Sequence, residues 1–174
     1  MALGQLAHMR KKLMNGKQQL ELYNNIIIDQ LKQGFIEIVE DAVVNDRCHY
    51  LPHHGVKKDS ETTPIRVVFN CSSKREGCPS LNDCLMSGPS LTAKLGDVLL
   101  KFRTNELAYC ADISKSFIRV GLQPCDRDVT RFLWYANPFD LKSPIIHYRF
   151  SVVLFGATCS PFLLQATLDT HLRT

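Results

Sequence analysis

The sequence has no long apolar run and no paired-cysteine motif. No stretch approaches the roughly 20 apolar residues of a membrane-spanning helix, and the N-terminal sequence MALGQLAHMRKKL lacks the apolar core of a signal peptide. The seven cysteines are scattered and include no C-x-x-C pair, a pattern that favours reduced thiols over a disulfide framework. We therefore expect a cytoplasmic or nuclear protein that is not secreted and has no membrane partner.

Repeats and low-complexity tracts are also lacking. The 174 residues, 45% hydrophobic and 22% charged, suit one modest domain or a piece of a larger one. A net charge of +4 permits a nucleic-acid partner without requiring one. Residues 1–20 nevertheless carry Arg10, Lys11, Lys12 and Lys17 and no acidic residue.

Hydrophobic periodicity predicts three helices and a strand-rich second half. The helices are expected over residues 17–33 and 91–102 and from Ser160 onward, where Ser160 suits an N-cap. Strands are expected at FIEIVE, YLPHHGVKK, IRVVFNCS, ELAYCADI, FIRVGLQ, RFLWYA and YRFSVVLF. SSKREGCPSLNDCLMSGPS reads as a surface loop. Because the last helix is cut off by the chain end, we expect the chain to be a piece of a longer domain.

The stretch LAYCADISKSF places one carboxylate, Asp112, at the end of an apolar, strand-like run. Burying a lone charge is costly, so such an aspartate normally has a partner or a metal ion. The alternative is an aspartate that ends a strand or caps a helix, a role that the nearby Ser114 could also fill. Phe117, five residues later, could close the space beside a sugar, or could be a core phenylalanine.

Two further segments could hold a nucleotide. Lys57, Lys58 and Arg66 lie on two expected strands joined by a turn, so that their charges could converge on one anion. The alternative is a solvated basic hairpin.

The second segment is FGATCSPFLLQ. Phe155 and Gly156 form a turn before the helix of Ser160, Pro161 and Gln165. A glycine that permits close backbone approach before a helix N-terminus suits a nucleotide or template contact. The alternative is a plain turn and cap.

In their order along the chain, several segments resemble the reverse transcriptases, most closely those of BEL/Pao long-terminal-repeat retrotransposons. The matching segments are YLPHHGVKK, IRVVFN, PSLNDCLMSGPSL, VLLKFR, ADISKSFIRVGLQPCDRDVTRFLW and YRFSVVLFGATCSPFLL. The resemblance implies an α+β, right-hand polymerase fold that stops before the second catalytic motif. Residues 1–49 would form an N-terminal basic segment and the first helix of the fingers, 50–105 the fingers with a basic hairpin, and 106–174 part of the palm.

The resemblance also implies two-magnesium nucleotidyl transfer, with Asp112 as the first metal-binding carboxylate and the Ile113 carbonyl as another ligand. It assigns nucleotide contacts to Arg66, one of Lys57 and Lys58, the sugar gate Phe117, Phe155 and Gly156. It assigns template or primer contacts to Ser160, Pro161 and Gln165. Asn70 stands where many relatives carry an acidic residue. The implied partners are an RNA or DNA template–primer, deoxynucleoside triphosphates and the remainder of a Gag-Pol-type polyprotein.

The other two metal carboxylates of this family lie in a Tyr-x-Asp-Asp-like turn, and the chain contains no such turn. The resemblance places Asp126 and Asp128 on a surface connection, and Asp169 lies on the last helix. We therefore predict that this 174-residue chain alone does not polymerise nucleotides and that its palm sheet has an exposed edge.

Two rival interpretations remain. The first is a degenerate remnant that only binds nucleic acid, through Arg10–Lys12, Lys57, Lys58, Lys74 and Arg75. The second is zinc binding by Cys48, His49, His53 and His54, although no second ligand pair has zinc-finger spacing.

Overall fold

The computed structural model describes residues 2–14, 16–40, 47–57 and 65–173. The helices are α1 (Ala2–Met14), α2 (Lys17–Lys32), α3 (Leu81–Cys84), α4 (Leu95–Arg103) and α5 (Ser160–Arg173), with 3-10 turns η1 (Phe117–Arg119) and η2 (Pro124–Thr130). The strands are β1 (Ile36–Ile38), β2 (His53–Lys57), β3 (Ile65–Phe69), β4 (Arg131–Tyr135) and β5 (Ile145–Phe150). This mixture confirms the α+β class. None of the described helices is long and apolar enough to cross a membrane.

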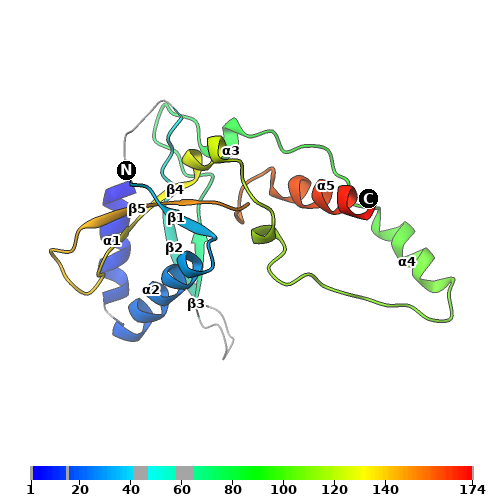
Figure 1. Cartoon of the computed structure of the whole chain (residues 1–174), viewed down its shortest axis with the longest axis horizontal. Helices are drawn as coiled ribbons and strands as arrows, with labels where there is room; N and C mark the ends of the chain where they lie inside the picture. Colours follow the sequence, from blue (N-terminus) through cyan, green and yellow to red (C-terminus); the bar gives the residue numbers. More distant parts are fainter. Residues whose placement is uncertain (1, 15, 41–46, 58–64, 174) are drawn as a thin grey trace.

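The strands form two small antiparallel sheets, one in the order β1-β5-β4 and the other a β2-β3 pair. Figure 1 shows both sheets together with α1 and α2 at one end of the molecule, and α4 and α5 at the other. Helix α1 contacts α2 and β4, and α2 contacts β3 and β1. Helices α1 and α2 therefore cover the sheets on the side where the main core forms.

Helix α2 follows directly from its apolar spacing. Leu20, Tyr23 and Ile27 recur at intervals of three and four residues, and all three side chains are buried. Gly34 follows the helix with φ of 72°, a left-handed conformation that glycine adopts without a Cβ clash. The predicted helix over 17–33 is therefore confirmed to within a residue.

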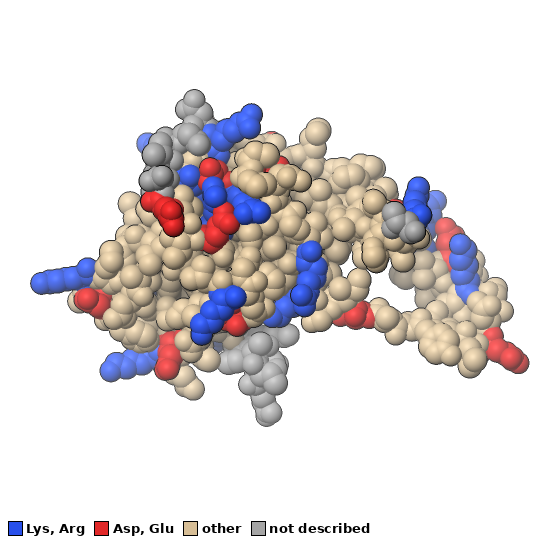
Figure 2. Space-filling view, viewed as in Figure 1, with Lys and Arg blue, Asp and Glu red and all other residues tan. Residues whose placement is uncertain are grey.

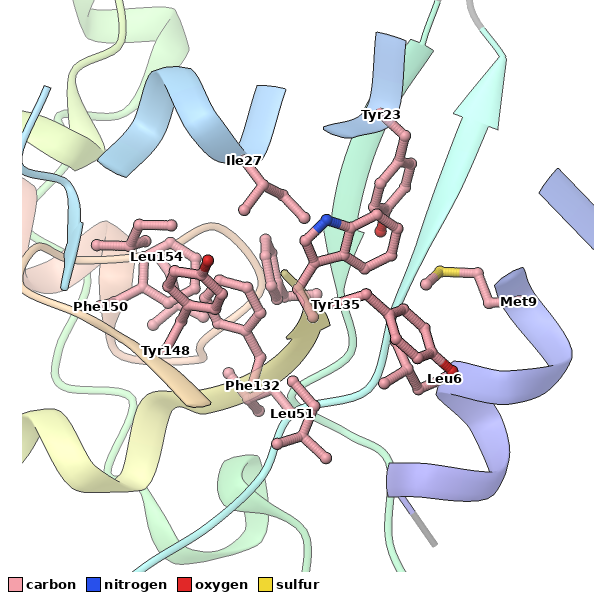
Figure 3. Close-up of a cluster of buried hydrophobic side chains, with 14 of the residues drawn as sticks. Leu6, Met9, Tyr23, Ile27, Leu51, Phe132, Tyr135, Tyr148, Phe150 and Leu154 are labelled. Atoms are coloured by element: carbon pink, nitrogen blue, oxygen red, sulfur yellow. The ribbon is translucent and has the colours of Figure 1, made fainter. Parts of the chain in front are cut away.

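Aromatic side chains fill the core between the helices and the sheets (Figure 3). Phe132 and Trp134 of β4 are almost fully buried, as is Tyr23 of α2. Phe132 also packs against Phe69 of β3 and Phe150 of β5, with ring centroids 4.9 and 5.5 Å away. Each such ring contributes about 1.5–3 kcal/mol by leaving water, so this cluster joins the two sheets.

Several polar groups in this core are paired across elements. His53 Nε2 lies 2.9 Å from the Leu133 carbonyl oxygen, which can only accept, so Nε2 carries the proton. Nδ1 then accepts from the Tyr23 hydroxyl at 2.5 Å. The Trp134 indole N–H donates to Asn24 Oδ1 at 2.9 Å. These bonds offset the cost of burying the polar atoms and connect α2, β2 and β4.

Five charged side chains link β1, β5, β4 and η2 on one face. Glu37 accepts from Arg127 and Arg149 at 2.9 and 2.6 Å, and Asp128 accepts from Arg131 and Arg149 at 2.9 and 2.8 Å. Burial raises the pKa of the Asp128 carboxyl, but the hydrogen bonds from the two arginines outweigh it, so the pKa lies below its ordinary value. The network therefore holds the Asp128 carboxylate between the arginines of β4 and β5.

The predicted strands over 106–113 and 117–123 are wrong. Residues 107–113 have no regular secondary structure, and the second segment begins with η1. We call residues 104–116, which connect α4 to η1, the arm; Figure 1 shows it crossing from α4 back to η1 apart from the core. Tyr109 on the arm is 89% exposed. In the part of the chain that the structure describes, no strand lies beside the arm, so a ladder cannot form there.

Helix α1 was not predicted, because the first residues read only as a basic segment. Leu6, Met9 and Leu13 are buried at helical spacing against the core. The short helix α3 was also missed inside the predicted surface loop. Its signal was the capping box: Ser80 Oγ accepts from the Asp83 N–H, and the Asp83 carboxylate accepts from the Ser80 N–H.

Candidate functional site

Three of the side chains assigned to a nucleotide site lie together. The Phe117 and Phe155 rings meet edge to face, with centroids 4.6 Å apart and an interplanar angle of 77°. The Arg66 guanidinium carbon lies 6.0 Å from the Phe155 centroid, at the limit of a cation–π contact. Arg66 comes from β3, Phe117 from η1 and Phe155 from the turn before α5. We call these three residues the aromatic–arginine face.

The aromatic–arginine face is accessible. Arg66 is exposed, Phe117 is half-buried, and Phe155 is 55% exposed although it follows the buried residues Val153 and Leu154. A ring that stays largely in water directly after two buried residues is available to contact a ligand. The arrangement therefore offers two aromatic surfaces and one cation to a molecule in solution.

Backbone geometry fixes the turn that carries Phe155. Gly156 has φ of 99°, and a Cβ on it would lie 3.2 Å from the Phe69 carbonyl oxygen at the end of β3. Only glycine combines that backbone conformation with so close an approach. Asn82, a residue to which the sequence alone assigned no role, also contacts this turn. The Asn82 side-chain amide donates a hydrogen bond to the Gly156 carbonyl at 3.0 Å.

The two basic residues expected to share an anion do not share a face. In the β2-β3 pair, Arg66 lies opposite Val56, whereas Lys57 lies opposite Ile65. Directly paired residues point to the same side and neighbours along a strand alternate, so Arg66 and Lys57 point to opposite sides. Lys57 is thus not presented with Arg66, and Lys58 lies outside the described residues.

Asp112 and Ile113 lie on the arm. Both are exposed, so Asp112 is not the buried carboxylate that its apolar neighbours suggested. Lys115 has φ of 56°, and the chain turns there before entering η1 with Phe117. Among the residues that the structure describes, no three histidine, cysteine, aspartate or glutamate side chains are placed to hold a metal ion.

Of the residues assigned to the template or primer, Ser160 is 2% exposed and its hydroxyl donates to the Leu154 carbonyl at 2.7 Å. That hydroxyl closes the turn before α5 and does not cap the helix as predicted. Pro161 is exposed, and the half-buried Gln165 donates to Asp169 at 3.3 Å. Pro161 and Gln165 are therefore the accessible members of this group.

The basic residues invoked for simple nucleic-acid binding are only partly available. Arg10 is 6% exposed, lies 4.3 Å from the centroid of the Tyr135 ring and donates to the Pro138 carbonyl. Lys74 pairs with Asp83 at 3.5 Å. On the face drawn in Figure 2, basic side chains are scattered and several lie beside acidic ones. Among the residues that the structure describes, no continuous basic patch is visible on this face.

The zinc interpretation is not supported by the geometry. Both ring nitrogens of His53 are used inside the core, by Tyr23 and by the Leu133 carbonyl. His54 follows on the exposed side of β2. Since a histidine must present a free nitrogen to a metal ion, His53 is not available as a ligand in this structure.

No protein-family model matches the chain, and no curated protein matches it significantly. The resemblance to the reverse transcriptases therefore rests on the quoted segments and stays a prediction.

Proposed function

We propose that the chain carries the fingers and the first palm segment of an RNA-directed DNA polymerase of the BEL/Pao retrotransposon type. In this proposal the aromatic–arginine face contacts the incoming deoxynucleoside triphosphate. The supporting observation is that Arg66, Phe117 and Phe155, which lie far apart in the sequence, lie together on an accessible surface. The template–primer and the rest of a Gag-Pol-type polyprotein would be the partners.

The chemistry of the face suits such a ligand. A guanidinium can donate two parallel hydrogen bonds to a phosphate group, and hydrogen bonds to charged groups contribute about 1.5–3 kcal/mol each. The exposed Phe155 ring offers a stacking surface for a base. Phe117 packs against it at an angle and would border the sugar, where a 2′-hydroxyl distinguishes ribonucleotides from deoxyribonucleotides.

The described residues do not fit a two-magnesium site by themselves. Asp112 is a single exposed carboxylate, and the nearby Ile113 carbonyl could add one neutral oxygen. Magnesium prefers six oxygen ligands, and a two-ion centre needs carboxylates from more than one segment. We expect no primer extension by this 174-residue chain with magnesium; incorporation of nucleotides would contradict this part of the proposal.

Equilibrium binding of a fluorescent deoxynucleoside triphosphate tests the proposal. We expect Arg66→Ala to weaken binding at least tenfold, because one charged hydrogen-bond donor pair is lost. Arg75→Ala is the matched control: Arg75 is also exposed and belongs to the rival set of basic residues. Equal losses in both variants, with strong salt dependence, would instead support non-specific nucleic-acid binding.

The role of Phe117 is tested with the matching ribonucleotide. If the ring borders the sugar, Phe117→Ala lowers the preference for the deoxyribonucleotide and leaves the affinity for the deoxyribonucleotide within a few-fold. An unchanged preference would remove Phe117 from the sugar site while leaving the Arg66 result to decide the rest of the proposal.

A further inference from the structure

Asn82 connects three segments through one side chain. Its Nδ2 donates to Ser72 Oγ at 2.9 Å and to the Gly156 carbonyl at 3.0 Å, and its Oδ1 accepts from the Thr158 N–H at 3.0 Å. The backbone N–H of Asn82 donates to the Cys71 carbonyl at 3.1 Å. One amide thereby joins the segment after β3, helix α3 and the turn before α5.

The position of Asn82 is itself fixed. The capping box between Ser80 and Asp83 holds the first turn of α3, and Leu81 beside it is buried in the core. A capping interaction of this kind contributes about 1 kcal/mol. Asn82 therefore presents its amide from a short but anchored helix.

An amide suits this contact. The Gly156 carbonyl accepts and the Thr158 N–H donates, and the two groups belong to the same turn. Asparagine supplies both on one planar group, an aspartate supplies only the acceptor, and alanine supplies neither. Gly156 has a left-handed backbone, and the two bonds from Asn82 join the turn at Gly156 and at Thr158.

We propose that Asn82 is a positioning residue that keeps the Phe155 ring against Phe117 and within reach of Arg66. Asn82 acts through the turn and does not touch the ligand. Its effect on nucleotide affinity rests on the proposed function, whereas its effect on the ring contact does not.

The test compares Asn82→Ala and Asn82→Asp with the unaltered chain by nuclear magnetic resonance. We expect Asn82→Ala to speed amide exchange of Thr158 at least tenfold and to abolish the nuclear Overhauser contact between the two rings. Asn82→Asp keeps the Thr158 acceptor, so Thr158 exchange stays slow while the ring contact weakens. Asn105→Ala is the control, because among the described residues the Asn105 amide donates to the Lys101 carbonyl at the end of α4, away from the turn; we expect no change.

Nucleotide affinity, measured on the folded fraction, separates positioning from simple stabilisation. A positioning role predicts at least a fivefold loss for Asn82→Ala, whereas a structural role lowers only the resistance to denaturant. If Asn82→Ala does not fold, the nucleotide affinity of Asn82→Asp and its resistance to denaturant decide instead. Unchanged Thr158 exchange and an intact ring contact in the alanine variant would overturn the proposal. If the unaltered chain binds no nucleotide, the proposed function fails, and the ring contact still decides the role of Asn82.

Discussion

The buried histidine of the core makes stability depend on pH. His53 sits between the Tyr23 hydroxyl and the Leu133 carbonyl, with the Phe132 and Trp134 rings about it. Burial disfavours the cation and lowers the pKa of His53 from 6.5 to about 4, although the Leu133 carbonyl opposes the shift. In the folded chain His53 is therefore mostly neutral at pH 5 and above.

The sign of the effect follows from proton binding. Below pH 6.5 the unfolded chain binds a proton at His53 that the folded chain does not, so stability falls as the pH falls. The contribution is fully present above pH 6.5 and is lost progressively toward pH 4. For these two pKa values of His53, the free energy of unfolding falls by about 2 kcal/mol at pH 5. It falls by about 3 kcal/mol at a pH low enough to protonate His53 in both the folded and the unfolded chain.

Urea unfolding followed by the fluorescence of Trp134, the single tryptophan, measures this loss. His53→Gln is the matched variant, because glutamine has a donor and an acceptor but does not titrate. We expect the stability difference between the two proteins to change by about 2 kcal/mol between pH 8 and pH 5. His49 and His147, whose pKa values burial also lowers, are common to both proteins and cancel.

A stability difference that stays constant between pH 8 and pH 5 would refute this reasoning. So would a nuclear magnetic resonance titration in which the folded His53 ring takes up its proton near pH 6.5.

Three further substitutions test the turn, the first helix and the arm. Gly156→Ala should lower the free energy of unfolding by about 1–3 kcal/mol, because its φ is positive and the new Cβ would crowd the Phe69 carbonyl; an unchanged urea midpoint would show that the turn adapts. Gly4→Ala lies in α1 with nothing within 4 Å of the added Cβ, so it should raise the free energy of unfolding by about 0.5–1 kcal/mol in the same assay. A lower free energy of unfolding in this variant would contradict a helix at Gly4. Asp112→Asn should change the free energy of unfolding by no more than about 0.5 kcal/mol relative to the unaltered chain, since Asp112 is exposed. A larger loss would mean that Asp112 is paired inside the fold.

Helix α2 and strand β4 could be predicted because their apolar patterns are local. Leu20, Tyr23 and Ile27 repeat at helical spacing, and RFLWYA has the aromatic content of a buried strand. Both segments pack against the core through those same residues. Local pattern and tertiary structure agree there.

The arm could not be predicted because a strand needs a neighbour. ELAYCADI has the composition of a strand, but composition cannot show which segment would supply the ladder bonds. The described chain supplies none, and Leu107 and Tyr109 lie in solvent. The exposure of Asp112 follows from the same cause.

Three of the residues assigned to a nucleotide site were named from motifs and lie together, although their geometry could not be predicted: Phe117 packs against Phe155, and the Arg66 guanidinium carbon lies 6.0 Å from the Phe155 centroid. The separation of Lys57 from Arg66 depends on strand register, which residue types alone do not fix. Asn82 lies in the quoted segment PSLNDCLMSGPSL, but the residue types there do not show which groups its amide contacts.

Photo-crosslinking tests the central claim most directly. The 174-residue chain is irradiated with a deoxyadenosine triphosphate that carries a photoreactive base, and the labelled peptides are identified by mass spectrometry. We predict label at or beside Phe155 and Phe117, competed by unmodified deoxynucleoside triphosphate and lost in Arg66→Ala but retained in Arg75→Ala. Label that gathers instead around Lys11, or that is lost equally in both variants, would contradict the claim that the aromatic–arginine face binds the nucleotide.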